Sequence, residues 1–268
     1  MKELFKFCGR IPAKVESIAG IVGALILIVV WYLVSTYSGV SDKILPSPVA
    51  VISCIPELIS DYELFGNIGY TVGLNLSGYF YAIIIAVPLG FAIGLFPVMR
   101  ALFQKPIEAI RFLPIPAASG LFIAAFGLTY TMKSSFLAFG ILIFLLPVIV
   151  HASLELQDPN NVKENVYLQT AKTIGMNKLQ MFRYVIFPFV MAKFYTNLRE
   201  LTAISYTYIV IAETLFKDHG IGASISTMGR IGRWDCVYAL LFIIIIIGIV
   251  QDFLFRVLEP VIFKYKRG

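Results

Sequence analysis

The stretch that decides the fold is Gln169–Pro188, QTAKTIGMNKLQMFRYVIFP, which lies between two apolar runs long enough to cross a bilayer. It carries Lys172, Lys178 and Arg183, and charged side chains are costly inside lipid. The pattern is therefore typical of a cytosolic loop that docks onto another protein. A chain built around such a loop is expected to be one part of a larger assembly that draws its energy from a partner.

The composition indicates a membrane protein. Of the 268 residues, 59% are hydrophobic and only 14% are charged, whereas soluble domains carry about 25% charged residues. The net charge of +6 does not require a nucleic-acid partner, because basic residues of membrane proteins collect on cytoplasmic loops. Cys8, Cys54 and Cys236 are widely spaced and match no metal-binding pattern, so they are expected to be packing residues.

The predicted fold class is an all-α integral membrane protein with six transmembrane helices. Each span needs roughly 20 mostly apolar residues. The six stretches that qualify are 18–37, 70–96, 107–130, 134–152, 187–212 and 237–258. The first follows a basic segment, as a signal peptide does, but its apolar run is longer than usual and no clear cleavage site follows. We therefore expect a membrane anchor.

The basic residues predict the orientation. Six crossings place both termini on one side, together with the loop 97–106, Arg111 and the segment 153–199. That side holds all but five of the 22 Lys and Arg residues. The five on the opposite side are Lys43, Lys133, Lys217, Arg230 and Arg233. Such an excess predicts that both termini are cytoplasmic.

This topology divides the chain into five parts. They are a cytoplasmic N-terminal segment 1–17, the anchor 18–37, an external loop 38–69 with an amphipathic helix, a core of five transmembrane helices 70–258 that includes the cytosolic loop 153–187, and a basic cytoplasmic tail 259–268. In the external loop, Ser47 is a predicted helix cap with Pro48 at the first helical position. A second outer loop, 213–236, is rich in glycine.

The second span carries small residues at intervals of four, which favour close helix packing in lipid or a helix that slides during transport. They are Gly69, Gly73, Ser77, Ala82, Ala86, Gly90 and Gly94.

Polar residues inside the spans are few. The ionisable residues His151, Glu200, Glu213, Asp252 and Glu259 all fall near predicted span ends. An ion-driven carrier usually places carboxylates near the midplane, so that class is disfavoured. The fifth span presents neutral hydrogen-bonding groups that are candidates to line a polar path, or that form ordinary interhelical hydrogen bonds. These candidates are Thr202, Ser205, Tyr206 and Thr207.

The sequence of the cytosolic segment 153–188 predicts two helices joined by a turn. Asn161 with Glu164, and Asn177 with Gln180, form capping-box patterns. Gly175 between them is expected to end the first helix. Tyr167, Ala171 and Ile174 form the predicted apolar face of the first helix, and Leu179, Phe182 and Ile186 that of the second. The pattern suits helices lying on anionic lipid or docking into a groove of a partner protein.

The spacing resembles the signature loop of ABC-importer permeases. That motif reads Glu-Ala-Ala, then Gly after three residues, then Ile-x-Leu-Pro after nine more. The corresponding residues are Gln169, Thr170, Ala171, Gly175, Val185, Phe187 and Pro188. Ala171, Gly175 and Pro188 match, Val185 and Phe187 are apolar replacements, and Gln169 and Thr170 depart from the motif. The resemblance implies that these seven residues dock the ATPase subunit.

The resemblance covers roughly residues 44–260 and is closest to the nitrate/sulfonate/taurine-type permeases. Its segments are LPSPVAV (45–51), GYFYAIIIAVPLG (78–90), RFLPIP (111–116), AET (212–214) and GIG (220–222). It implies the type I importer bundle in a bacterial inner membrane. Two permease copies, as a homodimer, two ATPase subunits and an external solute-binding protein would import a small anion such as a sulfonate, taurine or nitrate. A pyrimidine-type vitamin precursor is the alternative cargo.

No phosphate-binding G-x-x-x-x-G-K-[ST] motif occurs in the chain. ATP and Mg are therefore expected on the ATPase subunit, with no cofactor, metal site or catalytic residue on this chain. A secondary carrier is the second hypothesis. An integral-membrane enzyme is the third, and it would need a convergent catalytic set, whereas His151 and His219 fall on opposite sides of the membrane.

Overall fold

The computed structural model describes residues 12–216 and 218–267, and within them every regular element is helical. Residues 1–11 of the predicted N-terminal segment, with Cys8, and also Lys217 and Gly268, lie outside the described residues. The elements are α1 (Ala13–Tyr37), α2 (Pro48–Ser53), α3 (Ile55–Ser60), α4 (Leu64–Leu95), α5 (Pro97–Ile110), α6 (Ile115–Phe126), α7 (Tyr130–Gln157), α8 (Val162–Thr173), α9 (Lys178–Met181), the π-helical turn η1 (Phe182–Ile186), α10 (Phe187–Phe216), α11 (Ile221–Arg230), α12 (Trp234–Ile262) and the 3₁₀ turn η2 (Lys264–Arg267).

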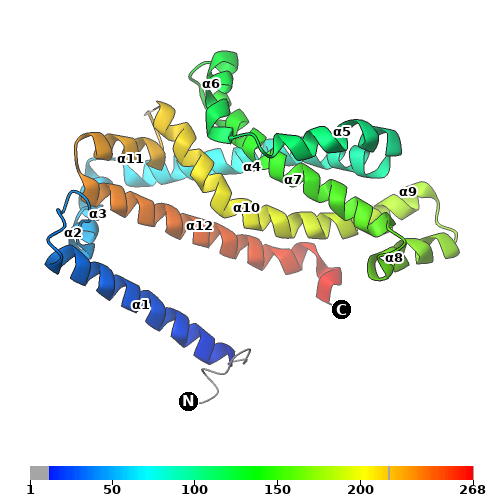
Figure 1. The fold of residues 1–268 in the computed structure, drawn as a ribbon, viewed down its shortest axis with the longest axis horizontal. Coiled ribbons are helices and arrows are strands. Elements are labelled where there is room, and N and C mark those ends of the chain that lie inside the picture. The colour runs from blue at the N-terminus through cyan, green and yellow to red at the C-terminus, as the bar shows by residue number, and fades with distance from the viewer. Residues whose placement is uncertain (1–11, 217, 268) are drawn as a thin grey trace.

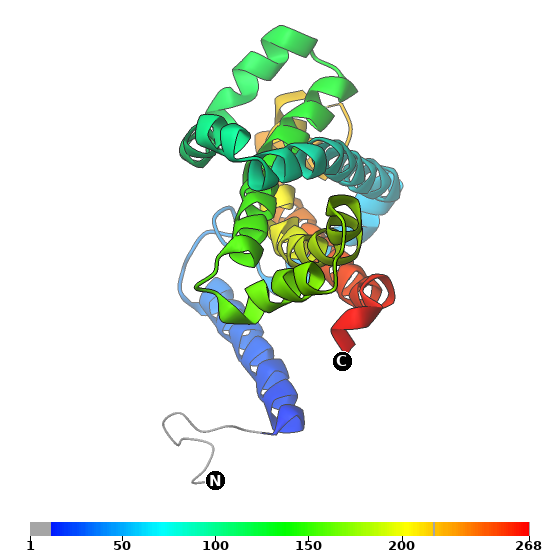
Figure 2. The ribbon, with the colours of Figure 1, turned by 90° about the vertical axis from the view of Figure 1, so that its right-hand side faces the viewer.

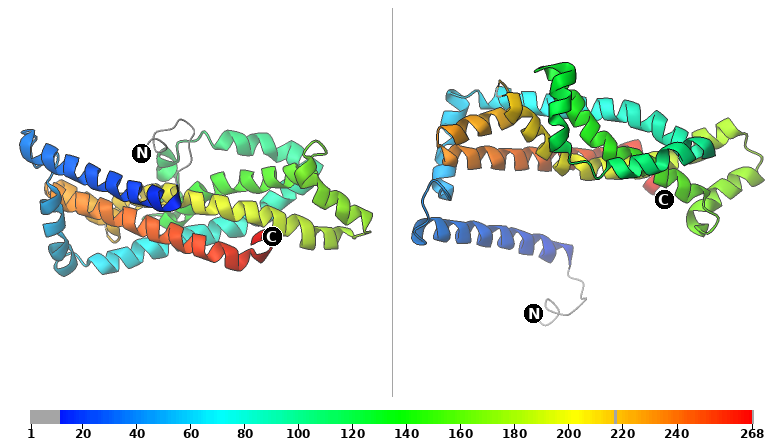
Figure 3. Two further views of the ribbon diagram at one scale, coloured as in Figure 1. Left: turned by 90° about the horizontal axis from the view of Figure 1, so that it is seen from below. Right: turned by 45° about the horizontal axis from the view of Figure 1, so that its top comes forward.

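The long helices α4, α7, α10 and α12 run along the length of the molecule (Figure 1). Helices α2, α3 and α11 lie at one end, and α8 and α9 lie at the other (Figures 1 and 3). Helix α1 extends away from this bundle (Figure 2). The predicted outer and cytosolic loops are thus separated by the length of the long helices.

Among the described residues, α1, α4, α7 and α12 are long and apolar enough to cross a membrane. The predicted span 107–130 is not one straight helix, because α5 and α6 meet at an angle of 107°. The break lies at residues 111–114, where Pro114 has an extended backbone and Pro116 follows two residues later. A residue before proline is pushed away from the helical region, so the pair Leu113–Pro114 interrupts the helix. Pro116 lies in the first turn of α6, where proline is tolerated.

Helix α10 covers the predicted span 187–212 and has 30 residues, which at 1.5 Å per residue exceed the bilayer core. It is more polar than the other long helices because it carries Lys193, Arg199 and Glu200. That α10 crosses the membrane, and with it the count of six spans, stays a prediction.

Helices α4 and α7 pack in close contact through small residues. A Cβ atom added to Gly90 would lie 2.6 Å from Ile149 Cβ, and one added to Gly94 would lie 2.7 Å from Ser153 Cβ. The second half of the predicted small-residue stripe therefore packs closely on α7, as expected. Gly73, nearer the start of α4, faces open space instead.

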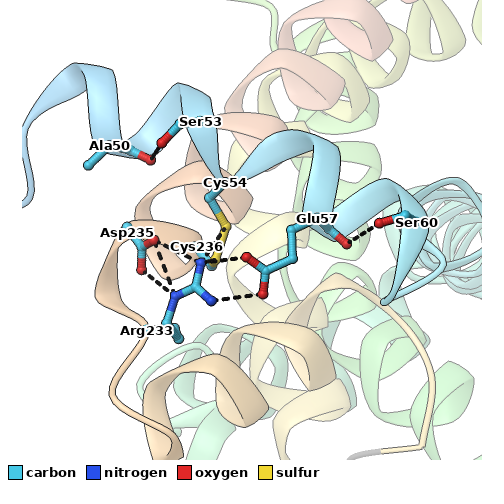
Figure 4. Close-up of a disulfide and its surroundings, with 8 residues drawn as sticks. All are labelled: Ala50, Ser53, Cys54, Glu57, Ser60, Arg233, Asp235 and Cys236. Atoms are coloured by element: carbon cyan, nitrogen blue, oxygen red, sulfur yellow. Dashed lines mark hydrogen bonds and ion pairs between the residues drawn. A yellow bond between two sulfur atoms is a disulfide. The ribbon is translucent and has the colours of Figure 1, made fainter.

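At the end that holds α2 and α3, the predicted cap is confirmed: Ser47 Oγ accepts a hydrogen bond from the Ala50 N–H at 3.2 Å. Cys54 and Cys236 are packed in a buried apolar cluster, as predicted, and they also form a disulfide that was not predicted (Figure 4). The two cysteines are 182 residues apart in sequence. Only the tertiary fold brings their Cα atoms to the separation that a disulfide requires.

The disulfide is flanked by a cluster of charges. Arg233 donates two hydrogen bonds of 2.7 Å to the Glu57 carboxylate and others to Asp235 (Figure 4). The bonds to Glu57, followed by those to Asp235, raise the pKa of Arg233 above its ordinary value. The disulfide and the ion pair together tie the α2–α3 segment to the start of α12.

Candidate functional site

The segment 161–187, called here the docking elbow, contains α8, α9 and η1 at the end opposite the disulfide (Figure 1). Gly175 ends α8 with a φ of +76°. The Met176 N–H donates to the Ala171 carbonyl and the Gly175 N–H to the Lys172 carbonyl, both at 3.0 Å. This is a Schellman arrangement, in which glycine takes the left-handed position. The predicted end of the first helix is confirmed.

The two predicted capping boxes have different outcomes. Asn177 Oδ1 accepts from the Gln180 N–H at 2.8 Å, and Gln180 Oε1 accepts from the Asn177 N–H at 2.9 Å, so the second box is confirmed. The first box is wrong, because Asn161 makes no side-chain cap hydrogen bond. Glu164, its predicted partner, instead accepts from Lys193 of α10 at 3.3 Å. A tertiary ion pair has displaced the local cap.

The predicted apolar face of α8 is largely exposed. Tyr167 and Ile174 are 57% and 64% exposed, as a face that lies on lipid or docks onto a partner requires, whereas Ala171 is buried. The buried face consists of Asn165, Leu168 and Ala171, and the Asn165 side chain donates to the carbonyl of Leu156 at the end of α7. Helical spacing groups residues on a face but does not say whether that face meets the body of the protein or a partner.

Exposed apolar side chains therefore surround a groove of about 950 Å³ between α8 and the start of α10. Four of the predicted docking residues line it: Thr170, Ala171, Val185 and Pro188. Their neighbours in the groove include Val166, Tyr167, Ile174 and Tyr184, which are largely exposed. A concave apolar surface on a charged elbow suits a helix or loop of another protein.

The other three predicted docking residues do not line this groove. The Gln169 amide donates to Asn165 Oδ1 at 2.9 Å. Gly175 lies at the exposed turn. The Phe187 ring stacks on Phe91 of α4 with the ring centroids 5.7 Å apart. Phe187 thus connects the elbow to the membrane bundle.

A second groove, of about 1000 Å³, runs between α10 and α12. Three of the four pathway candidates, Thr202, Tyr206 and Thr207, line it. Ser205 does not, because it is buried and its hydroxyl donates to the Thr202 carbonyl at 2.8 Å. The face of α10 that lines this groove therefore carries the aromatic ring of Tyr206 and the side chains of Thr202 and Thr207.

Sequence reasoning missed Gln251, which supports this wall. The Tyr206 hydroxyl donates to Gln251 Oε1 at 2.7 Å, and the Asn75 amide of α4 donates to the same oxygen at 3.3 Å. All three residues are buried. The available signal was one glutamine at the end of the apolar run FIIIIIGIVQ of α12, because a buried amide in a span usually has a specific partner.

The same groove ends in a charged cluster that sequence reasoning had not grouped. Arg199 of α10 pairs with Asp252 at 3.1 Å and with Glu259 at 3.5 Å, both on α12. Arg256 pairs with Asp252 at 3.1 Å. The groove is thus apolar toward the disulfide end and charged toward the elbow end, where Arg199 ties α10 to α12.

Glu213 lies near the end of α10, close to the predicted span end. Its side chain is fully buried where α10 meets α4 and α11.

A family model described as the inner membrane component of binding-protein-dependent transport systems matches residues 82–264. The chain belongs to this family. The matched region contains the docking elbow and both helices of the second groove. The chain is therefore a permease component of a transport system, and its grooves are surfaces of a transporter.

Relatives within this permease family cover nearly the whole chain. The taurine transport system permease protein TauC of Escherichia coli (strain K12) is 25% identical over 87% of this chain and 84% of its own length. The putative aliphatic sulfonates transport permease protein SsuC of Bacillus subtilis (strain 168) is 22% identical over 93% and 88%.

The helical arrangement is also similar to a chain of the inward-facing MetNI methionine ABC transporter. The TM-score is 0.60 at 14% sequence identity, and the match covers 75% of this chain and 98% of that chain. At this identity the likeness shows the fold alone, and it is the fold of an ABC-importer permease.

Proposed function

We propose that this permease forms the translocation pathway of an ATP-driven importer for a small sulfonate-type solute such as taurine. The observation that carries the proposal is the family match over residues 82–264, which includes both grooves. The driving force comes from a separate ATPase, since the chain has no phosphate-binding loop motif of its own. This permease therefore changes conformation during transport, and the separate ATPase supplies the energy.

The docking elbow receives the ATPase subunit. Its exposed groove, lined by Thr170, Ala171, Val185 and Pro188, accepts an apolar segment of that subunit. ATP-driven closure of two ATPase subunits moves two elbows together, and Phe187 passes the movement to α4 through Phe91. Conformational switching through a packed interface requires such a contact with two arrangements.

The α10–α12 groove forms half of the pathway, and a second copy of the chain supplies the other half. Thr207, which is exposed in the groove, offers its hydroxyl to the passing solute, and the buried Thr202 and Tyr206 form the wall behind it. A C2 dimer places the same groove of each copy against the other. The homodimer then encloses a path whose inner end is charged and whose outer end is apolar.

The elbow faces the cytosol of a bacterial cell and the disulfide end faces outward, where a solute-binding protein delivers the cargo. The excess of basic residues on the elbow side supports this orientation. The Cys54–Cys236 disulfide supports it independently, because disulfides persist in oxidising compartments outside the cytosol.

The names of the relatives support a cargo class. Two of them are described as permeases for taurine and for aliphatic sulfonates. A competing class comes from the formylaminopyrimidine transport permease protein ThiX of Halalkalibacterium halodurans, which is 22% identical over 91% of this chain and 94% of its own length.

The test is reconstitution with candidate ATPase and solute-binding proteins from the same genome. Taurine, an alkanesulfonate, nitrate and formylaminopyrimidine are each assayed for stimulation of ATP hydrolysis and for uptake into proteoliposomes. We expect taurine or the alkanesulfonate to stimulate both. Stimulation by formylaminopyrimidine alone would overturn the cargo class, and solute accumulation by this chain without any ATPase would overturn the importer assignment.

A further inference from the structure

The first turn of α11 is held by side chains of α4. The Gly220 N–H donates to Asn67 Oδ1 at 2.7 Å, and the Ile221 N–H donates to Thr71 Oγ1 at 2.9 Å. The first N–H groups of a helix have no carbonyl partner within that helix. Two side chains of α4 therefore satisfy backbone donors of α11 that would otherwise stay unpaired.

Glu213 at the end of α10 completes this arrangement. Its Oε2 accepts from the Gly222 N–H at 2.7 Å, and its Oε1 accepts from Thr71 Oγ1 at 2.8 Å. Glu213 and Thr71 are both fully buried, and the ammonium group of buried Lys133 acts electrostatically on the carboxylate. Hydrogen bonds to a carboxylate are about twice as strong as neutral ones, so one side chain joins three helices.

The spacing of the glycines in GIG follows from this contact. Gly220 has a φ of +103°, and a Cβ atom there would overlap the Glu213 carboxylate. A Cβ atom at Gly222 would lie 2.8 Å from the carbonyl oxygen of Val210. Val210 itself lines the α10–α12 groove. The missing side chains thus let the start of α11 lie directly against Val210, a lining residue toward the outer end of that groove.

The other side of α11 packs against the buried cluster that contains the Cys54–Cys236 disulfide. Ile221 and Met228 belong to one buried cluster with Cys54, Leu58 and Cys236. The disulfide and the ion pair of Arg233 hold this cluster together. Between α11 and α10, by contrast, the polar tie is the carboxylate of Glu213.

We propose that Glu213 is a positioning residue of transport, which holds α11 across the outer end of the α10–α12 groove as an outer gate. Release of the Gly222 N–H from the carboxylate frees the start of α11 to move away from Val210, which opens the groove to the outside. This inference rests on the proposed function in one respect, namely that the groove is the path of the solute.

The experiment measures access to the groove from outside. Ala203 lines the groove and is exposed in it, so Ala203→Cys is introduced with Cys8→Ser, which leaves one thiol beside the disulfide. Intact cells are treated with a membrane-impermeant maleimide. We expect Glu213→Ala to speed labelling by about tenfold or more, the factor that corresponds to one lost hydrogen bond to a charged group.

Thr214→Val is the matched control. Thr214 is the next residue of α10, and its hydroxyl donates only to carbonyls of its own helix, those of Val210 and Ile211. Its replacement should leave labelling unchanged. A labelling rate in Glu213→Ala equal to that of the parent, or the same increase in Thr214→Val, would overturn the proposal.

Glu213→Gln keeps the test decisive if Glu213→Ala fails to fold. The amide preserves shape but cannot accept from both Thr71 and Gly222, so we expect a smaller increase in labelling, and an unchanged rate counts against the gate. Retention of the Cys54–Cys236 disulfide, seen as a mobility shift on reduction, reports that the outer end has folded. The labelling needs no ATPase, so its outcome is distinguishable from a failure of the proposed function, which is tested by reconstitution with the ATPase.

Discussion

Cys54 and Cys236 are joined by a disulfide whose Cα atoms lie 5.5 Å apart, although 182 residues separate them in the chain. Cys54 lies at the junction of α2 and α3, and Cys236 lies in the first turn of α12. The bond closes a loop that contains the whole bundle from α4 to α11. It therefore restricts the unfolded chain far more than a local crosslink would.

Replacing Cys54 with serine should lower the stability of the purified protein. Loss of a native disulfide typically costs about 2–5 kcal/mol, so we expect a lower midpoint of thermal unfolding in detergent. Reductant should lower the midpoint of the parent and have no further effect on the variant. Cys8→Ser, which leaves the disulfide intact, is the control and should behave as the parent does. Equal midpoints for Cys54→Ser and the parent would contradict the prediction.

Replacing Gly175 with valine should uncouple the elbow. The φ of +76° is left-handed, and a residue with a Cβ atom pays about 1–2 kcal/mol there. No atom lies within 4 Å of a Cβ at this position, so the effect is one of backbone strain and not of collision. We expect solute uptake and solute-stimulated ATP hydrolysis to fall together while the amount of protein in the membrane is maintained.

Asparagine tolerates the left-handed region better than other residues, which makes Gly175→Asn the matched variant for the elbow. It should retain most of the activity. Valine and asparagine variants that transport equally well would show that the turn geometry at Gly175 does not matter.

Replacing Gly90 with alanine should disturb the packing of α4 on α7. The new Cβ atom would lie 2.6 Å from Ile149 Cβ, and such overpacking costs about 1–3 kcal/mol. Gly73→Ala adds the same methyl group to the same helix in open space. In thermal unfolding, the first variant should lose stability and the second should not, and equal midpoints would argue against a close α4–α7 contact.

Replacing Arg199 with glutamine should weaken the tie between α10 and α12. Arg199 pairs with two carboxylates of the other helix and is only 24% exposed, so we expect a loss of about 1–2 kcal/mol, between the limits for exposed and buried pairs. Arg256→Gln removes a pair within α12 at a side chain that is 65% exposed. This control should have a smaller effect on thermal stability, and the reverse order would contradict the assignment.

Features set by neighbouring residues could be predicted from the sequence. The Ser47 cap, the capping box of Asn177 and the glycine stop at Gly175 each depend on a few adjacent positions. The capping box predicted at Asn161 does not form because a distant residue intervenes. Lys193 lies 29 residues from Glu164 and pairs with its carboxylate. A local rule holds only where no distant residue competes.

The parts of the site that could not be predicted depend on distant contacts. The spacing of Tyr167 and Ile174 groups them on one face, but it does not show that α8 packs on the protein through Asn165 and Leu168. The place of Glu213 near a span end does not show that Thr71, 142 residues away, contacts its carboxylate in the interior. Both contacts depend on which element lies beside a helix, and one helix's periodicity carries no such information.

The first helix contacts the rest of the molecule near its C-terminal end. Trp31 stacks on Tyr238 and Phe242 of α12 and donates to the Pro46 carbonyl, while the start of α1 diverges from the bundle (Figures 1 and 3). A rod attached near one end can change its inclination when the surrounding bilayer becomes thicker or thinner. We therefore expect α1 to adjust to such mismatch by pivoting at Trp31, without deforming the α10–α12 groove in membranes of differing lipid composition.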